Sequence, residues 1–126
     1  MRDLEKYRGV IPAFYACYDE DGEISAERTE ALALHFLKKG VKGLYVNGSS
    51  GECIYQSVED RKKVLEHVMK VVGGKLTIIA HVACNNTKDS VELAAHAEKL
   101  GVDAIAAIPP IYFHLPDHAI ADYWND

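Results

Sequence analysis

Two adjacent serines between glycines are the residues of this chain best suited to chemistry. They lie in the run Gly48-Ser49-Ser50-Gly51, directly after the apolar residues Leu44-Tyr45-Val46. Glycines let the backbone approach a ligand, so N–H groups and two hydroxyls can gather around a small anion. No Gly-Lys-Ser/Thr follows, and a nucleoside triphosphate would lack its counter-charge. The loop therefore predicts a carboxylate site formed by Gly48, Ser49 and Ser50, although an ordinary glycine-rich turn fits the same letters.

Alternating strands and helices must position this loop. Ser25 is suited to cap a helix that Gly40 stops, and Ser57 with Asp60 has the spacing of a capping box. The nearly unbroken apolar run 76–82 is typical of a parallel strand covered on both faces. The expected strands are 9–16, 44–46, 76–82 and 104–108, and the expected helices begin after the Ser25 cap, at Ser57, at Thr87 and at Pro116.

Two junctions along the chain look like copies of each other. Residues 39–44 and 100–105 both read as helix end, glycine, valine, polar residue, small residue and strand. A repeated strand–helix unit predicts an α/β fold with a parallel sheet. An open doubly wound sheet and half of a barrel fit this pattern equally well, and in both a ligand binds beyond the carboxyl ends of the strands. The serine loop and the segment 111–113 both follow strands in this way.

Length and charge limit the classes of function. The chain has 126 residues, about half of a (β/α)8 barrel, and 48% of them are hydrophobic. A net charge of −5 argues against nucleic acid as a partner, because phosphate binding needs a basic patch. The stretch 1–6 has no apolar signal core, and no apolar run approaches membrane-spanning length. We expect a cytoplasmic protein that binds neither nucleic acid nor a membrane.

The cysteines indicate neither a disulfide framework nor a metal site. Cys17, Cys53 and Cys84 are odd in number, widely separated and without a Cys-x-x-Cys pair. We expect three reduced thiols and no bound metal. Cys53 lies just beyond the serine loop, but a packed, unreactive thiol is the favoured interpretation.

Three longer runs resemble one family. GLYVNGSSGECIYQS, IIAHVACNNT and DAIAAIPPIYF are similar, in order and spacing, to the first half of the pyruvate-dependent Schiff-base aldolases, the dihydrodipicolinate synthase and N-acetylneuraminate lyase family. Gln56-Ser57 and Ala80-His81-Val82 look more like the N-acetylneuraminate lyase branch. The resemblance runs from Arg8 to Asp126. It implies a (β/α)8 TIM barrel of which residues 1–126 form the amino-terminal half, with about four βα units.

The resemblance also implies roles for single residues. Ser49 would belong to a proton relay, and Ser50 would bind the substrate carboxylate with its hydroxyl and N–H. Tyr112 would reach into the active site of a neighbouring subunit in a homo-oligomer, a tetramer in the family. The implied reaction of the full-length protein is cleavage of N-acetylneuraminate to pyruvate and N-acetylmannosamine, without metal or organic cofactor. A dihydrodipicolinate synthase or another 2-keto acid aldolase is the alternative within this class.

The family's imine-forming lysine has no counterpart among these residues. Lys42 and Lys75 precede strands, which places them at the opposite end of the sheet from the ligand, and other lysines lie on expected helices. The resemblance places that lysine and a phenolic tyrosine beyond Asp126. The 126-residue chain alone is therefore expected to be inactive, and a non-catalytic half-barrel that assembles or binds an anion is the second hypothesis.

Three further residues near the loop have structural interpretations. Glu52 is expected to bond to backbone within its own loop. His81 lies on an apolar strand, where a hydrogen-bonded core histidine is the favoured state. Asn47 is expected either to narrow the pocket or to accept a left-handed turn.

Overall fold

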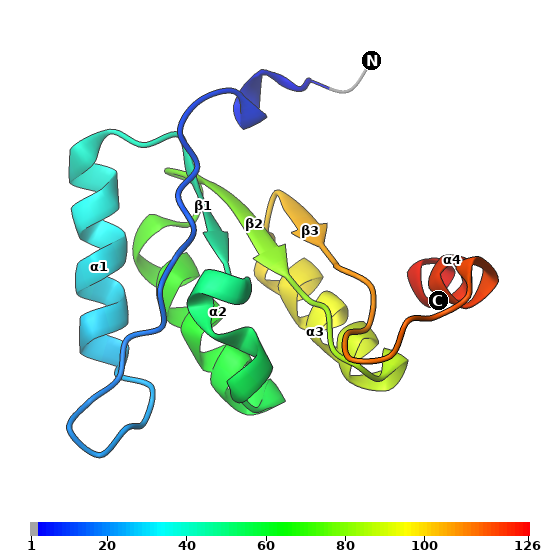
Figure 1. Ribbon diagram of the computed structural model, residues 1–126. Helices are drawn as coiled ribbons and strands as arrows, with labels where there is room; N and C mark the ends of the chain where they lie inside the picture. Colours follow the sequence, from blue (N-terminus) through cyan, green and yellow to red (C-terminus); the bar gives the residue numbers. More distant parts are fainter. Residues whose placement is uncertain (1–2) are drawn as a thin grey trace.

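A parallel sheet covered by helices forms the body of the molecule (Figure 1). The computed structural model describes residues 3–126, so the first two positions of the stretch 1–6 lie outside the described residues. The strands are β1 (Gly43–Val46), β2 (Thr77–His81) and β3 (Ala104–Ala106), in that spatial order. The helices are α1 (Ala26–Lys39), α2 (Val58–Val72), α3 (Thr87–Leu100) and α4 (Asp117–Asn125), with short 3-10 helices η1 (Glu5–Tyr7), η2 (Ser49–Gly51) and η3 (Cys53–Tyr55).

The strands run parallel, as the repeated junctions predict. Leu44 pairs with Ile78, and Ala80 pairs with Ile105. Helices α1, α2 and α3 lie side by side in chain order along the sheet (Figure 1). Because the strands are parallel, their carboxyl ends meet at one edge, where the loops 47–57, 82–86 and 107–116 follow them.

The prediction of a regular first strand over residues 9–16 was wrong. These residues run beside β1. Two backbone bonds join them to β1, Tyr45 N to Pro12 O at 3.0 Å and Phe14 N to Tyr45 O at 2.9 Å, and a third joins Lys42 N, just before β1, to Val10 O at 2.8 Å. Only one bridge, between Ala13 and Tyr45, is regular. Pro12 has no N–H to donate, so the regular ladder is interrupted there, although Val10 still accepts the Lys42 N–H. The segment is an extended edge chain with one proline-interrupted rung.

The other boundaries follow from local chemistry. The Ser25 Oγ accepts the Arg28 N–H at 3.2 Å, and the Ser57 Oγ accepts the Asp60 N–H at 3.0 Å. Gly40 ends α1 at φ 74°, a left-handed conformation that glycine adopts without strain. The expected strand 104–108 is shorter than predicted and ends at Ala106, which pairs with His81, the last residue of β2.

The core lies between the sheet and α1 to α3. Strand residues contribute one face and helix residues the other, with Phe14 of the edge chain covering one end. The fully or nearly buried apolar residues include Phe14, Ala33, Leu44, Val46, Val64, Val68, Val72, Ile78, Ala80, Leu93 and Ala97.

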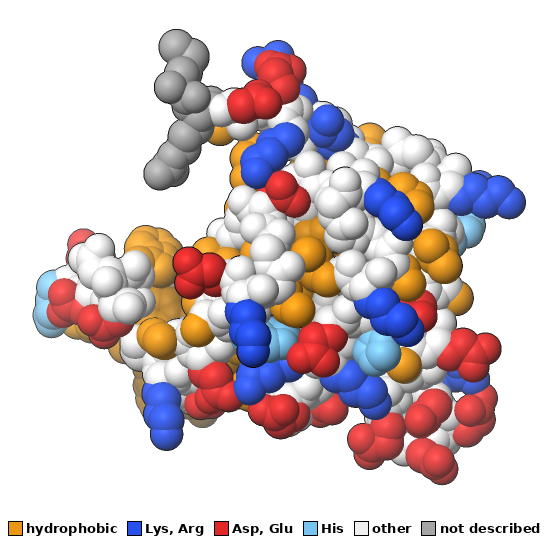
Figure 2. All heavy atoms as spheres, turned by 180° about the vertical axis from the view of Figure 1, so that it is seen from behind, with side chains coloured by type: hydrophobic (Ala, Val, Ile, Leu, Met, Phe, Trp, Pro, Cys, Tyr) orange, Lys and Arg blue, Asp and Glu red, His pale blue; other side chains and the backbone are white. Residues whose placement is uncertain are grey.

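Apolar side chains also remain exposed along the edges of the sheet. Val10 is 69% exposed, Ile105 is 52% exposed and Ile108 is 43% exposed, whereas Phe14 is buried. Figure 2, which views the molecule from behind, shows hydrophobic side chains scattered among acidic and basic groups, with acidic side chains gathered at one corner. Among the described residues, no helix is long and apolar enough to cross a membrane.

Candidate active site

The serine loop begins with a left-handed residue at the end of β1. Asn47 has φ 63°, which asparagine tolerates better than most side chains, so the turn explains its presence. A Cβ on Gly48 would lie 2.6 Å from the Tyr45 ring, and one on Gly51 would lie 2.9 Å from the Phe14 carbonyl oxygen. The two glycines therefore let the loop lie directly on the sheet and the edge chain.

Ser49 and Ser50 lie at the start of η2, and both are exposed. The Gly48 carbonyl accepts the Gly51 N–H at 3.0 Å, which closes the turn below them. Among the described residues, the N–H groups and hydroxyls of Ser49 and Ser50 have no hydrogen-bond partner. Two free N–H groups and two free hydroxyls side by side can bind a carboxylate.

Side-chain hydrogen bonds hold the end of the serine loop at Gly51 and Glu52. The Tyr18 hydroxyl donates to Glu52 Oε2 at 2.7 Å, and Gln56 Nε2 donates to the Gly51 carbonyl at 2.7 Å. The expectation that Glu52 bonds to backbone in its own loop was therefore wrong. Glu52 has φ 58°, a conformation that turns its carboxylate to the tyrosine. Burial raises the pKa of Tyr18, and the bond to Glu52 adds to that rise, so the hydroxyl stays a donor.

His81 is a hydrogen-bonded core histidine, as expected. It is 3% exposed, with Nδ1 3.0 Å from the Asn47 carbonyl oxygen and Nε2 3.4 Å from the Ile108 N. Burial lowers the pKa of His81, and the nearby Arg61 guanidinium lowers it further. The ring is therefore neutral, and it joins the loop after β1 to the segment after β3.

Arg61 is a site residue that the sequence reasoning missed. It is 2% exposed and donates from Nη1 to the Ala83 carbonyl at 2.7 Å and from Nη2 to the His81 carbonyl at 2.7 Å. No carboxylate of the described residues lies within ion-pair distance of it. The available signal was its spacing: it stands three residues before Val64 and four before Leu65, on the buried stripe of α2.

A cavity of about 540 Å³ lies behind the serine loop. Ser49, Arg61 and His81 border it, whereas Ser50, Gly48 and Tyr112 do not. It separates the loop 47–57 from the loops after β2 and β3. The structure thus brings Ser49, but not Ser50, to the same cavity as the buried polar residues.

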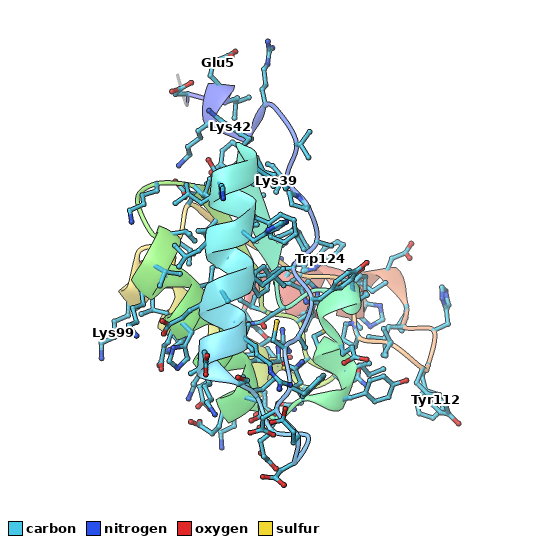
Figure 3. All side chains as sticks on the ribbon, turned by 90° about the vertical axis from the view of Figure 1, so that its left-hand side faces the viewer. Glu5, Lys39, Lys42, Lys99, Tyr112 and Trp124 are labelled. Carbon is cyan, nitrogen blue, oxygen red and sulfur yellow. The ribbon has the colours of Figure 1, made fainter. Side chains whose placement is uncertain are left out.

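Tyr112 stands apart from the serine loop. Its ring is 90% exposed and packs edge-to-face on Phe113, with centroids 4.8 Å apart. Its φ of 86° is unusual for a residue other than glycine. The Ile111 N–H just before it donates to Asn85 Oδ1 at 2.9 Å. Figure 3 shows the side chain pointing away from the body of its own chain.

The lysines lie away from this edge of the sheet. Among the described residues, none is on a strand or in the loops 47–57, 82–86 and 107–116. Lys42 and Lys39 lie at the end of the molecule opposite Tyr112 (Figure 3). Lys62 is paired with Glu59 and Glu92. The described part of the chain also has no group of three His, Cys, Asp or Glu residues placed to hold a metal. Among the described residues, this edge of the sheet therefore has hydroxyl and N–H groups that can bind a carboxylate but no lysine amine.

Known proteins resemble this chain along nearly all of its length. It is 79% identical over 125 residues to the N-acetylneuraminate lyase of Mediterraneibacter gnavus, which covers 99% of this chain and 40% of the relative. It is 39% identical over 118 residues to the N-acetylneuraminate lyase of Escherichia coli O1:K1, covering 94% of this chain and 40% of that relative. The chain therefore spans about 40% of the length of these curated relatives.

Solved structures agree with this result. The Ruminococcus gnavus sialic acid aldolase catalytic lysine mutant superposes with a TM-score of 0.97 at 79% identity, covering 99% of this chain and 41% of that one. The N-acetylneuraminate lyase of Mycoplasma synoviae superposes with a TM-score of 0.94 at 31% identity, covering 97% of this chain and 43% of that one.

These structures decide between the two architectures that the sequence pattern left open. Their fold is the TIM barrel, and the matched part of it is the amino-terminal half. The expected half-barrel is confirmed. The model of the dihydrodipicolinate synthetase family matches residues 6–126. The chain belongs to the dihydrodipicolinate synthetase family.

Proposed function

We propose that the full-length protein carrying this sequence is an N-acetylneuraminate lyase, which cleaves sialic acid to pyruvate and N-acetylmannosamine. The observation that carries the proposal is the free Ser49-Ser50 loop at the carboxyl end of β1. Its two unpaired N–H groups and hydroxyls suit the carboxylate that pyruvate and sialic acid share. The 79% identity to the Mediterraneibacter gnavus lyase supports this substrate over that of a dihydrodipicolinate synthase.

In this mechanism the chain holds the substrate and relays protons. The Ser50 hydroxyl and N–H bind the carboxylate, which fixes the neighbouring keto carbon for attack by a lysine from the later part of the barrel. Ser49 passes protons to and from the reacting oxygen. Gly48 lets the loop lie close enough to the sheet for both serines to face the ligand. No metal or organic cofactor takes part.

Tyr112 completes the relay in a second subunit of a homo-oligomer, a tetramer in this proposal. Its 90% exposure, its left-handed backbone and its direction away from its own chain support a role between subunits (Figure 3). Exposed Phe113 and Ile111 beside it supply apolar surface for the contact.

A hybrid lyase tests the proposal. It joins residues 1–126 to the part of the Mediterraneibacter gnavus lyase that follows the matched region. We expect it to release pyruvate from N-acetylneuraminate and to form a pyruvyl adduct, visible by intact mass after borohydride reduction. A well-folded hybrid with neither property would contradict the proposal. Sequencing the gene beyond codon 126 then locates the natural lysine.

The 126-residue chain alone provides the comparison. With no lysine at the carboxyl ends of its described strands, it should form no pyruvyl adduct under the same treatment. A stable adduct on this chain would show that the nucleophile is present after all. A weakly bound pyruvate without an adduct would support the carboxylate loop as a binding element.

A further inference from the structure

A buried polar network connects all three strand ends at the candidate site. The Asn47 Nδ2 donates to the Arg61 carbonyl at 2.8 Å, and the Arg61 Nη2 donates to the His81 carbonyl at 2.7 Å. The His81 Nδ1 lies 3.0 Å from the Asn47 carbonyl oxygen, and this contact links the last of the three residues back to the first. All three residues are at most 4% exposed. The three residues therefore form a closed ring of buried hydrogen bonds that joins the end of β1, α2 and the end of β2, and His81 Nε2 extends it to Ile108 after β3.

The two ring nitrogens of His81 face opposite partners. Nδ1 faces the Asn47 carbonyl oxygen, which can only accept, so Nδ1 carries the proton. Nε2 faces the Ile108 N–H, which can only donate, so Nε2 accepts. One neutral tautomer satisfies both bonds, and a protonated ring would lose the second.

The two nitrogens of the His81 imidazole bond to different parts of the site. Asn47 immediately precedes Gly48 and the two serines, so Nδ1 holds the start of the carboxylate loop. Ile108 lies four residues before Tyr112, with Pro109 and Pro110 between them to stiffen the chain. Nε2 therefore holds the start of the segment that carries the tyrosine.

Arg61 anchors the network from the helix layer. A buried guanidinium without a carboxylate partner is costly to desolvate, and two backbone carbonyls and the Cys84 sulfur offset that cost only in this arrangement. Its Nε has no partner among the described residues. A hydrophobic residue would fill the same buried position of α2 at a lower desolvation cost. The arginine is therefore better explained by the loops to which it bonds.

We propose that His81, with Asn47 and Arg61, is a positioning residue that sets the carboxylate loop through Nδ1 and the Tyr112 segment through Nε2. The proposal rests on the proposed lyase function for its kinetic consequences. It goes beyond that function because it assigns a role to three buried residues that the proposed mechanism does not use.

Two substitutions in the hybrid lyase separate the two bonds. His81→Asn places an amide N–H where Nδ1 stands and leaves the Ile108 N–H unpaired; His81→Gln places an amide oxygen near Nε2 and leaves the Asn47 carbonyl unpaired. We expect His81→Gln to raise the KM for N-acetylneuraminate about tenfold and His81→Asn to lower kcat about tenfold, the effect of one lost buried bond.

Thr77→Val is the matched control. Thr77 is the first residue of β2 and His81 the last; the Thr77 Oγ1 donates to the Lys6 carbonyl at 2.8 Å and the residue is 7% exposed. Loss of this hydrogen bond in Thr77→Val should lower the melting temperature of the hybrid lyase, as the His81 substitutions should. KM and kcat should stay unchanged. If Thr77→Val shifts KM or kcat as much as the His81 variants, the kinetic effects are those of general destabilisation and the proposal is overturned.

Hydrogen exchange gives a readout that needs no activity. His81→Gln should speed amide exchange across 48–53, and His81→Asn should speed it across 108–113. Asn47→Gly should also speed exchange across 48–53, because it removes the Asn47 Nδ2 bond to the Arg61 carbonyl while glycine keeps the left-handed turn. Unchanged exchange in both segments would overturn the positioning role. An inactive wild-type hybrid with these exchange changes would refute the lyase proposal and leave the network intact.

Discussion

At the residue scale, the two serines of the loop are adjacent but differ in their surroundings. Ser49 borders the cavity that also touches His81 and Arg61, whereas Ser50 does not border it. Both residues are exposed on the same backbone turn, and only Ser49 lines the cavity with the buried network. This difference supports the separate roles that we propose, a proton relay for Ser49 and carboxylate binding for Ser50.

The first prediction separates these serines in the hybrid lyase. Ser50→Ala should weaken keto acid binding by about 1.5 to 3 kcal/mol, because one hydrogen bond to a charged carboxylate is lost. Ser49→Ala should instead lower kcat more than it raises KM, because a relay hydroxyl matters when the proton moves. Steady-state kinetics and pyruvate calorimetry check both. Equal losses of binding alone for the two variants would remove the distinction.

The second prediction concerns pH and His81. Burial and Arg61 lower the pKa of His81 below its ordinary value of 6.5, so folding favours the neutral ring. The stability that His81 contributes is present above pH 6.5 and is lost as pH falls toward the lowered folded pKa. The charged or titratable groups facing it are Arg61 and Tyr45, whose ring centroid lies 6.1 Å away.

Thermal unfolding of the hybrid lyase between pH 7.5 and pH 5 measures this effect. The wild type should lose melting temperature more steeply on acidification than His81→Asn, which has no titrating ring. Other acidic groups act equally in both proteins, so the difference isolates His81. Parallel curves for the two proteins would contradict the prediction.

At the element scale, the end of β1 determines where the loop lies. Tyr45 on the strand is half-buried and packs below Gly48, while Asn47 between them turns the chain with a positive φ. A strand, a left-handed residue and a short 3-10 turn follow within a few positions. The placement of the serines therefore depends on the close contact between Gly48 and the Tyr45 ring.

Gly48→Ala tests that contact. The new Cβ would lie 2.6 Å from the Tyr45 Cε1, so the ring or the loop must move, at a cost of about 1 to 3 kcal/mol in the free energy of unfolding. Denaturant unfolding of the hybrid lyase measures it. In a Tyr45→Ala background the same substitution should cost much less, because the ring is gone. An undiminished cost there would place the strain elsewhere.

At the scale of the whole molecule, the chain presents half of a barrel. The edge chain and β3 are its two outer members, and Val10 and Ile105 on them are more than half exposed. In a closed barrel such edges pair with further strands. Tyr112 also points away from this half (Figure 3), so two of its surfaces are suited to contacts with other parts of a larger assembly.

Isolated residues 1–126 should therefore self-associate. Open strand edges and the exposed side chains of Val10, Ile105 and Ile108 favour contact between copies. Sedimentation velocity should show oligomers whose share grows with concentration, whereas the hybrid lyase should give one defined species. A compact monomer of the isolated chain that binds no hydrophobic dye would count against this expectation.

Mixed oligomers test the role of Tyr112. Tyr112→Phe in the hybrid lyase should keep the fold, since the hydroxyl has no partner among the described residues, but should lose much of kcat. Mixing it with a variant that lacks the catalytic lysine should restore activity above either parent, because one subunit's tyrosine serves the other's lysine. No recovery despite proven subunit exchange would place Tyr112 in its own subunit's chemistry or in packing alone.

The sequence by itself determined the alternating elements, most of their boundaries and the location of the serine loop. The boundaries of the helices depend on interactions over a few residues, such as the caps at Ser25 and Ser57, the stop at Gly40 and the apolar stripe of α2. The neighbouring sequence is therefore enough to predict them. The family also followed from motifs that are contiguous in the chain.

Only the tertiary structure decided how the site is held. Arg61, His81 and Ile108 are far apart in sequence, and their bonds arise because parallel strands bring their carboxyl ends to one edge. The same holds for Glu52, which bonds to Tyr18 rather than to its own loop, and for the edge chain, where Pro12 prevents a regular strand. Buried polar groups form hydrogen bonds with the partners that the fold brings near them. The neighbouring residues in the sequence do not identify those partners.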